Sequence, residues 1–327
     1  MRGTLLAGVT LALVAPAAPA FGQSANQSVT SITVFGDSLV DAGNINTLNP
    51  SVASPAAGYF DGRFTNGYDY TDLLSISLFG TPTTASLEGG TNFAFGGARA
   101  TNTSGVPDLG EQLGLFQGYL AGGGEVDETG LYVLNFGGND IFNALGTGAP
   151  AGYESDSAYL LAAATSYAQG VQTLADLGAT NFLITGFPNP VPLSLEAEGY
   201  LFDALAALPL AEGVTLNFYS YLDFFGRLTA NPAQFGLPAN LDFATTCQAA
   251  AAFPSCSGYF SFDGTHPTAA VHQAVFTDIQ EQFGFAAAAG GAVPEPATWA
   301  MMLLGFAFVG SALRGARQRR RVEVRFA

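Results

Sequence analysis

Short apolar runs alternate with longer segments of helical periodicity along most of this chain, and no other feature restricts its fold as strongly. Each run is about four to six residues long, which suits a buried strand, while the longer segments repeat apolar residues every three to four positions. The expected strands are residues 32–35, 131–136, 181–185 and 214–218. The expected helices are residues 68–78, 109–120, 157–177, 200–208, 221–228 and 268–283. Strands separated by helices form a parallel sheet, so the sequence predicts an α/β fold with helices on both faces of a central parallel sheet.

Polar residues follow two of these strands and also precede the last helix. Ser38 comes shortly after the first strand, and Asn139 follows the second. The carboxyl ends of parallel strands meet at one edge of a sheet, where functional loops gather. Asp263 and His266 stand three positions apart just before the last helix. A serine, a histidine and a carboxylate are the set that nucleophilic catalysis needs, and an asparagine amide can donate to an oxyanion, so the pattern predicts a hydrolase.

Four blocks of sequence around these residues resemble the GDSL, or SGNH, hydrolases. The blocks are residues 35–44, 92–98, 137–140 and 263–268, and the resemblance covers nearly all of residues 31–285. Two further stretches, residues 63–67 and 231–236, resemble the lipase/acylhydrolase branch of that family. The resemblance implies the three-layer, flavodoxin-like fold of the SGNH hydrolases, with no cofactor and no metal.

The resemblance also implies catalytic roles for three residues. Ser38 attacks an ester carbonyl, and His266 takes the serine proton and later gives it to the leaving alcohol. Asp263 orients the imidazole and stabilises its charged form.

An oxyanion hole is implied by the same resemblance. Its expected donors are the backbone N–H of Ser38, the side-chain amide of Asn139 and one backbone N–H from Gly96 or Gly97. A glycine suits this position because the backbone must approach the substrate closely. Gly97 is favoured, and Gly96 stays open as the alternative.

Several other residues near the blocks have structural interpretations. Asp37 and Asp140 are expected to bond backbone groups at the strand ends rather than to take part in catalysis. Arg63 could hold a substrate carboxylate or phosphate, but an ion pair within the protein is favoured. His272 is expected to be a surface or packing residue, and the aromatic residues at 218–225 are expected to pack in the core rather than line an acyl pocket.

The two cysteines, Cys247 and Cys256, are nine positions apart. Export to an oxidising compartment favours a disulfide between them. Such a bond would stiffen the approach to Asp263. Two cysteines with His266 as the one nearby histidine make a poor zinc site, so no metal is expected.

Both ends of the chain have the composition of export signals. Residues 1–22 combine Arg2, an apolar stretch and small residues, which predicts a secretory signal peptide cleaved after Ala20 or Gly22. At the other end, residues 297–313 carry no charge and are followed by a cluster of arginines. This pattern predicts a short membrane helix whose basic end stays in the cytoplasm.

The sequence Val293-Pro294-Glu295-Pro296 stands just before this apolar stretch, and the order of the parts resembles the PEP-CTERM sorting signal of exported bacterial proteins. The resemblance implies transient anchoring in the inner membrane of a Gram-negative-type bacterium. Processing by an exosortase-type sorting enzyme then releases the protein to the outer surface or the extracellular matrix. The expected organisation is a signal peptide at residues 1–22, a hydrolase domain at 23–285, a linker at 286–292 and a sorting segment at 293–327.

The charge of the chain excludes one class of partner. It carries 26 acidic and 10 basic residues, a net charge of −16. Only Arg63, Arg99 and Arg227 lie between the two ends, so the domain itself repels nucleic acid.

The sequence predicts an exported serine esterase or lipase whose substrate is an acyl lipid or an acetylated glycan. Two alternatives remain open at this point. The protein could be a deacetylase of a matrix polysaccharide, or a non-catalytic surface protein associated with exopolysaccharide on the same scaffold.

Overall fold

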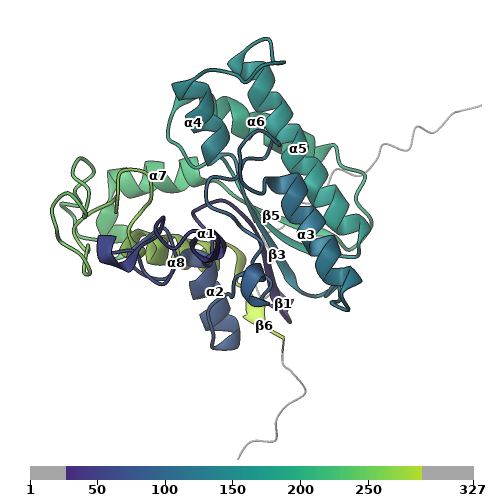
Figure 1. Ribbon diagram of the computed structural model, residues 1–327, viewed down its shortest axis with the longest axis horizontal. Coiled ribbons are helices and arrows are strands. Elements are labelled where there is room, and N and C mark those ends of the chain that lie inside the picture. The colour runs from purple at the N-terminus through teal and green to yellow at the C-terminus, as the bar shows by residue number, and fades with distance from the viewer. Residues whose placement is uncertain (1–26, 289–327) are drawn as a thin grey trace, which may run out of the picture. The chain divides into compact units, whose positions relative to one another are not determined.

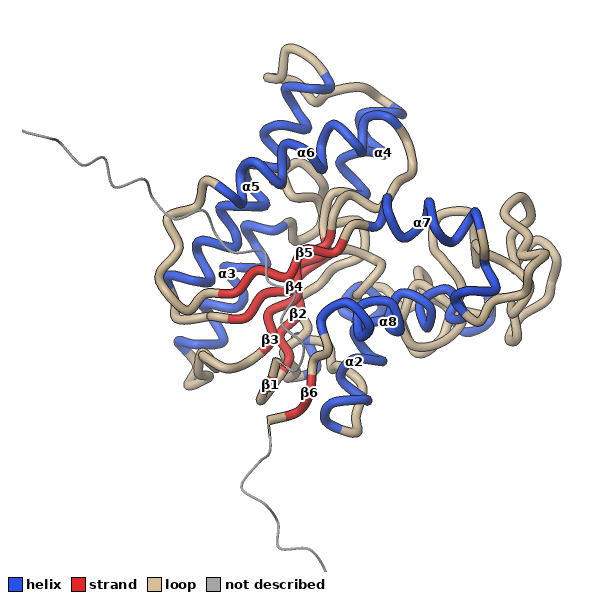
Figure 2. Tube along the Cα trace, turned by 180° about the vertical axis from the view of Figure 1, so that it is seen from behind, coloured by secondary structure: helices blue, strands red, loops and turns tan. Residues whose placement is uncertain are grey.

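The computed structural model describes residues 27–288, which contain a central sheet of four parallel strands. The strands lie in the order β2 (Ile32–Gly36), β3 (Leu131–Asn135), β4 (Asn181–Thr185) and β5 (Thr215–Tyr219). Figures 1 and 2 show helices packed on both sides of this sheet. The predicted α/β fold with a parallel central sheet is therefore confirmed.

The helices that surround the sheet differ in length and position. They are α1 (Asn44–Leu48), α2 (Tyr70–Phe79), α3 (Leu109–Ala121), α4 (Gly138–Gly146), α5 (Asp156–Asp176), α6 (Pro192–Ala206), α7 (Tyr221–Ala230) and α8 (Ala269–Phe283). Three short 3₁₀ turns, at Pro55–Ala57, Ser86–Glu88 and Pro232–Phe235, lie in the loops.

Side chains of β3 show how the two faces of the sheet build two cores. Tyr132 and Leu134 point into one core, which also holds buried residues of α3, α5 and α6. Leu131 and Val133 point into the other, with α2, α7 and α8. Alternate residues of a strand face opposite sides, and both sides are buried here, so residues 131–134 are all hydrophobic and Asn135 alone is polar.

The segment at residues 91–95 runs beside β2 and extends the sheet locally. The backbone N–H of Phe93 donates to the carbonyl of Val34 at 2.7 Å, and that of Phe95 donates to the carbonyl of Gly36 at 3.1 Å. The two segments therefore end side by side, and Gly96 and Gly97 follow at the edge where Ser38 lies.

Three helices differ from the sequence prediction. Helix α6 begins at Pro192, eight positions before the expected start at residue 200. Proline suits the first turn of a helix, where its missing N–H has no partner to lose. Helices α1 and α4 were not predicted, because each begins inside a glycine-containing block that indicates a turn.

The ends of the described region pair with each other. Strand β1 (Ser28–Val29) pairs with β6 (Ala286–Ala287), and the N–H of Ala286 donates to the carbonyl of Gln27 at 2.9 Å. The linker expected from residue 286 thus starts with two residues in a strand. The predicted signal peptide, the membrane helix at residues 297–313 and the sorting segment lie outside the described residues. Within residues 27–288, no helix is long and apolar enough to span a bilayer.

Candidate active site

Ser38 is held at the carboxyl end of β2 by the residue before it. The N–H of Asp37 donates to the carbonyl of Asn135 in β3 at 3.1 Å. Oδ1 of Asp37 accepts from the N–H of Leu39 at 3.0 Å and from the side-chain amide of Asn135 at 3.1 Å. Burial raises the pKa of Asp37 to about 7. The expected structural role of Asp37 is confirmed by these contacts.

The structure brings together the serine, histidine and aspartate that are far apart in the sequence. Oγ of Ser38 lies 2.8 Å from Nε2 of His266, and Nδ1 of His266 lies 2.7 Å from Oδ2 of Asp263. Each contact is within hydrogen-bond range, so a proton can pass from the hydroxyl to the ring while the carboxylate holds the other side of the ring.

A single turn positions both Asp263 and His266. Oδ1 of Asp263 accepts from the N–H of Thr265 and from the N–H of His266, each at 2.8 Å. Burial alone would raise the pKa of Asp263, but the hydrogen bond and the charge of His266, with the backbone donors, outweigh burial and lower the pKa to about 2. The carboxylate is therefore ionised at neutral pH.

The two candidate glycines of the oxyanion hole are distinguished by what their N–H groups bond. The N–H of Gly96 donates to Oδ2 of Asp41 at 2.8 Å, so it is not free to bind substrate. Within the described residues the N–H of Gly97 has no hydrogen-bond partner, and neither has that of Ser38. Gly97 also has a φ of +90°, a left-handed conformation that favours glycine.

Asn139 lies at the start of α4, close to the same loop. Its side-chain amide donates to the carbonyl of Ala98 at 2.9 Å, which leaves the second hydrogen of the amide group available. The neighbouring Asp140 accepts from the N–H of Ala100 and from the hydroxyl groups of Thr101 and Tyr159. Asp140 therefore anchors α4 to the loop that carries Gly97, in agreement with its expected structural role.

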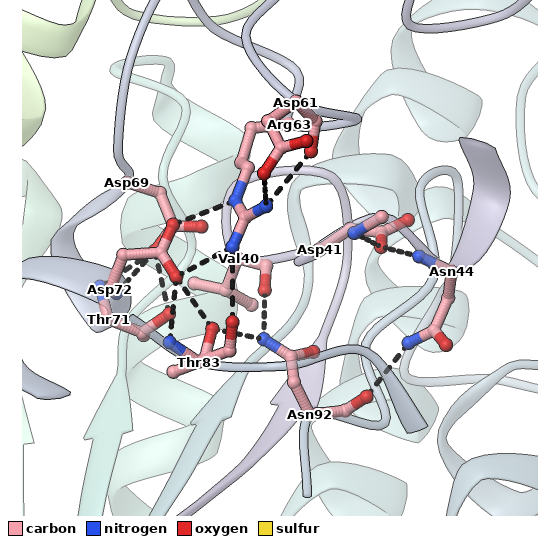
Figure 3. Close-up of polar contacts among 11 residues, drawn as sticks. Val40, Asp41, Asn44, Asp61, Arg63, Asp69, Thr71, Asp72, Thr83 and Asn92 are labelled. Carbon is pink, nitrogen blue, oxygen red and sulfur yellow. Dashed lines mark hydrogen bonds and ion pairs between the residues drawn. The ribbon is translucent and has the colours of Figure 1, made fainter. Parts of the chain in front are cut away.

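A buried polar network supports the loops behind the site (Figure 3). Asp41 accepts from the N–H groups of Gly43 and Asn44 through Oδ1, in addition to that of Gly96 through Oδ2. The amide of Asn92 donates to the carbonyl of Val40 at 2.7 Å. These bonds join the segment after Ser38 to the segment before Gly96, and so fix two parts of the site relative to each other.

Arg63 belongs to the same network and is not a substrate contact. It is 5% exposed, and its guanidinium donates to Asp72 through Nε at 2.9 Å and through Nη2 at 3.1 Å (Figure 3). A third bond reaches Asp61 at 3.1 Å. The favoured interpretation of Arg63, an ion pair within the protein, is confirmed.

The disulfide between Cys247 and Cys256 is present in the structure, as predicted. The N–H of Cys247 donates to the carbonyl of Ser261, and that of Gln248 donates to the carbonyl of Phe262, both at 2.9 Å. The loop closed by the disulfide is thus bonded to the residues directly before Asp263.

One residue of the site has no signal in the sequence. The hydroxyl of Tyr59 donates to Oδ2 of Asp263 at 2.8 Å. Tyr59 lies in a loop with no motif, 204 positions from its partner. Only a pattern that linked such distant positions could have identified it.

Two cavities meet at Ser38, Asn139 and His266. The first, which we call the inner cavity, has a volume of about 230 Å³ and apolar walls formed by Leu39, Phe142, Pro188, Phe225, Phe260 and Val275. The second, which we call the outer cavity, has a volume of about 530 Å³ and walls formed by Ile45, Leu48, Val52, Phe64 and Val106.

Burial distinguishes the two cavities. In the inner cavity Phe225 and Val275 are 8% and 2% exposed, and only Phe142 of the named wall residues is largely exposed, at 46%. In the outer cavity Ile45 is 8% exposed, but Leu48 and Val52 are 62% and 40% exposed. Tyr221 and Phe225 were expected to pack in the core, and they do so, but both also line the inner cavity. No group of three or more histidine, cysteine or acidic residues that could hold a metal occurs among residues 27–288.

Comparisons of sequence identify two known patterns. The family model of the GDSL-like lipases/acylhydrolases matches residues 32–279. The PEP-CTERM protein-sorting motif matches residues 292–320.

Matches to individual relatives cover part of this chain and part of each relative. An uncharacterized protein in the trpE-trpG intergenic region of Pseudomonas putida is 33% identical, over 76% of this chain and 45% of the relative. A GDSL esterase/lipase of Arabidopsis thaliana is 31% identical, over 51% of this chain and 55% of the relative. The thermolabile hemolysin of Vibrio parahaemolyticus is 24% identical, over 77% of this chain and 63% of the relative. The chain therefore spans less than two thirds of the length of these relatives.

Among solved structures, an acetylxylan esterase from Geobacillus stearothermophilus is similar to this chain. The TM-score is 0.43 and the sequence identity is 13%, over 79% of this chain and 95% of the esterase.

Proposed function

This chain belongs to the family of GDSL-like lipases/acylhydrolases, and on that premise we propose that it is an exported serine esterase that hydrolyses esters of aliphatic acids. The observation that carries the proposal is the pair of contacts Ser38–His266 and His266–Asp263, at 2.8 and 2.7 Å, at the point where two apolar cavities meet.

The proposed reaction begins with Ser38. Its Oγ attacks the ester carbonyl carbon while its proton moves to Nε2 of His266. Asp263 stabilises the imidazolium through Nδ1 and does not itself take the proton. The C–O bond to the alcohol then breaks, and His266 gives the proton to the departing oxygen. A water molecule attacks the acyl-enzyme in the same way, with His266 again taking and returning the proton, and the free acid leaves.

Three hydrogen-bond donors are candidates to stabilise the negative charge that develops on the carbonyl oxygen. These are the N–H of Ser38, the N–H of Gly97 and the amide of Asn139. We assign the glycine role to Gly97 because Asp41 already accepts from the N–H of Gly96. Donors that are fixed in place before the reaction stabilise the transition state without a cost of reorganisation.

The two cavities support an aliphatic substrate. We assign the acyl chain to the inner cavity because its walls are the more buried, and each methylene removed from water contributes about 0.8 kcal/mol. The alcohol is assigned to the outer cavity, which opens to solvent and lets the product leave. A sugar would bring hydroxyl groups against apolar walls, where they would lose hydrogen bonds.

Export is part of the proposed function. The PEP-CTERM motif indicates export through the exosortase system of a Gram-negative-type bacterium. We further propose removal of residues 1–22, transient anchoring in the inner membrane through residues 297–313, and release after processing near Pro294-Glu295-Pro296. The enzyme would then meet its substrate at the outer surface or in the extracellular matrix.

The experiment that tests the proposed function compares the exported protein with its Ser38→Ala variant. Hydrolysis of p-nitrophenyl acetate and p-nitrophenyl octanoate is measured, together with acetate release from an acetylated polysaccharide. We expect turnover of the octanoate, and loss of that turnover in the variant with an unchanged circular dichroism spectrum.

The other possible results identify the alternatives. Equal turnover by the Ser38→Ala variant would refute the nucleophile. Efficient acetate release from the polysaccharide with little octanoate hydrolysis would favour the deacetylase. A parent protein that hydrolyses no ester at all would favour the non-catalytic surface protein.

A second experiment tests which cavity takes which part of the ester. Methyl octanoate and heptyl acetate are isomers that place the long chain on opposite sides of the same bond. We expect Leu48→Asp, in the outer cavity, to lower kcat/KM for heptyl acetate about tenfold more than for methyl octanoate. Leu195→Asp is the control, because Leu195 is 69% exposed on α6 and lines neither cavity. The reverse selectivity in Leu48→Asp would exchange the two assignments.

A further inference from the structure

One polar side chain of the inner cavity is not used by the proposed reaction. His272 lies on α8, lines the inner cavity and is 3% exposed. Its backbone N–H donates to the carbonyl of Thr268 at 3.0 Å. Within residues 27–288, neither nitrogen of its ring has a hydrogen-bond partner, and its nearest aromatic neighbour is the ring of Tyr70, with centroids 6.4 Å apart.

The ring of His272 is held in its neutral form. Burial, with a smaller contribution from the charge of His266, lowers the pKa of His272 to about 3. A neutral imidazole has one N–H donor and one acceptor nitrogen. The group that complements it best is a hydroxyl, which can donate and accept at once.

Two other buried polar residues along the inner cavity have protein partners. The hydroxyl of Tyr221 donates to Oδ1 of Asn135 at 2.9 Å, and Asp37 accepts two bonds through Oδ1. Oδ1 of Asn189 is a second lining atom without a partner, and the NH₂ group of the same amide adds donors, but Asn189 is only partly buried. His272, at 3% exposure, is therefore the most deeply buried of the lining residues that offer both a donor and an acceptor, since Asn189 is only partly buried and Thr265 is exposed.

We propose that His272 recognises a hydroxyl group on the acyl chain, so that the substrates are esters of hydroxylated aliphatic acids. This proposal rests on the proposed esterase function and on the acyl chain occupying the inner cavity. The apolar walls of Leu39, Phe142 and Val275 bind the stem of the chain. An unsubstituted chain that reached His272 would leave a buried donor and acceptor unpaired, whereas a hydroxyl pairs them.

The test uses methyl octanoate and methyl esters of octanoic acid with one hydroxyl at each position from C3 to C7. For the parent protein we expect at least one hydroxylated isomer to exceed methyl octanoate by about tenfold or more in kcat/KM. His272→Leu should remove that preference, and His272→Gln, which keeps a donor and an acceptor, should restore part of it. Val271→Ala is the matched control, because Val271 is buried on the same helix and does not line the cavity.

Specific results would overturn the proposal. One is a parent protein that hydrolyses methyl octanoate and prefers none of the hydroxylated isomers. Another is a preference that survives in His272→Leu and disappears in Asn189→Leu, which would move recognition to Asn189. A parent protein that hydrolyses none of these esters would instead defeat the proposed function itself.

A measurement on the parent protein alone covers the case in which the His272 variants fail to fold. Inhibition by the free acids is compared, and the hydroxyoctanoic acid of the preferred isomer should have an inhibition constant about tenfold below that of octanoic acid. Equal inhibition constants would contradict the assignment of His272.

Discussion

The hydroxyl of Tyr59 lies 2.8 Å from Oδ2 of Asp263, the oxygen that also meets Nδ1 of His266 at 2.7 Å. Burial and the hydrogen bond to Asp263 both raise the pKa of Tyr59, so the hydroxyl stays protonated and can donate. The ring of Tyr59 packs against Phe262 with centroids 5.0 Å apart, in the cluster that holds the disulfide. Tyr59 thus connects the disulfide loop to the carboxylate, and we infer that it positions this carboxylate.

We predict that Tyr59→Phe lowers kcat about tenfold and leaves the fold intact, because one hydrogen bond to a charged carboxylate is lost. The carboxylate then holds more negative charge against His266, so the acid limb of the kcat/KM profile should move to higher pH. Tyr119→Phe serves as the control, since the hydroxyl of Tyr119 bonds no described residue. An unmoved pH profile would leave Tyr59 with a packing role only.

Asn139→Ala should lower kcat by roughly 10²–10³ and change KM less, because a fixed donor acts mainly on charge that develops in the transition state. Steady-state kinetics on p-nitrophenyl octanoate measures both constants. Asn143→Ala, one turn further along the same helix, is the matched control, since its amide bonds only Gly148 and Thr147 and lines neither cavity. A raised KM with unchanged kcat would mean that Asn139 binds substrate but does not stabilise the oxyanion.

Replacing both cysteines by alanine should lower the free energy of unfolding by about 2–3 kcal/mol, since a short closed loop is released in the unfolded chain. The loop is bonded to Ser261 and Phe262, just before Asp263. In the double variant, activity should therefore fall at denaturant concentrations that leave its far-ultraviolet circular dichroism unchanged. Activity and circular dichroism that fall together would show that the disulfide supports the whole domain equally.

Stability should decrease as the pH rises from about 5 to 8, and Asp37 accounts for part of this decrease. Burial raises the pKa of Asp37 to about 7, whereas an unfolded aspartate titrates near about 3.9. Between these values the folded protein holds a proton that the unfolded chain releases, so the contribution of Asp37 to stability is largest below about pH 4 and is lost as the pH rises through 7.

The measurement for this prediction is the Tm at pH 5 and pH 8 for the parent and for Asp37→Asn. The variant cannot ionise at this position, so its Tm should depend less on pH. Some dependence of Tm on pH is still expected in the variant because of Asp69. Burial also raises the pKa of Asp69 to about 7. An identical slope in both proteins would show that Asp37 is not the titrating group.

Mature protein recovered from the host should lack both ends of the chain. The motif at residues 292–320 indicates exosortase processing, and cleavage near Pro294-Glu295-Pro296 removes the apolar stretch and the arginines. Mass spectrometry of the terminal peptides gives the answer directly. A mature extracellular form that still ends at Ala327 would contradict the processing step.

Local sequence was sufficient for much of the fold. Strands β2, β3, β4 and β5 lie within one or two residues of their predicted positions, because each is a short apolar run between turn residues. Helix α5 starts after Ser155, whose side chain accepts from the N–H of Ala158, and such a cap is visible within four residues of sequence. The disulfide was predictable because the chain has only two cysteines.

By itself the sequence singled out the residues to which we assign the chemistry, since Ser38, Asn139, Asp263 and His266 all lie in short motifs. The choice between Gly96 and Gly97 was made only in three dimensions, because the acceptor that occupies the N–H of Gly96 is Asp41, 55 positions away. The contact of Tyr59 with Asp263 spans 204 positions, and the cavities arise where several loops meet. A local pattern specifies what a segment can form, whereas a free donor, a buried partner or a cavity depends on which distant segments pack beside it.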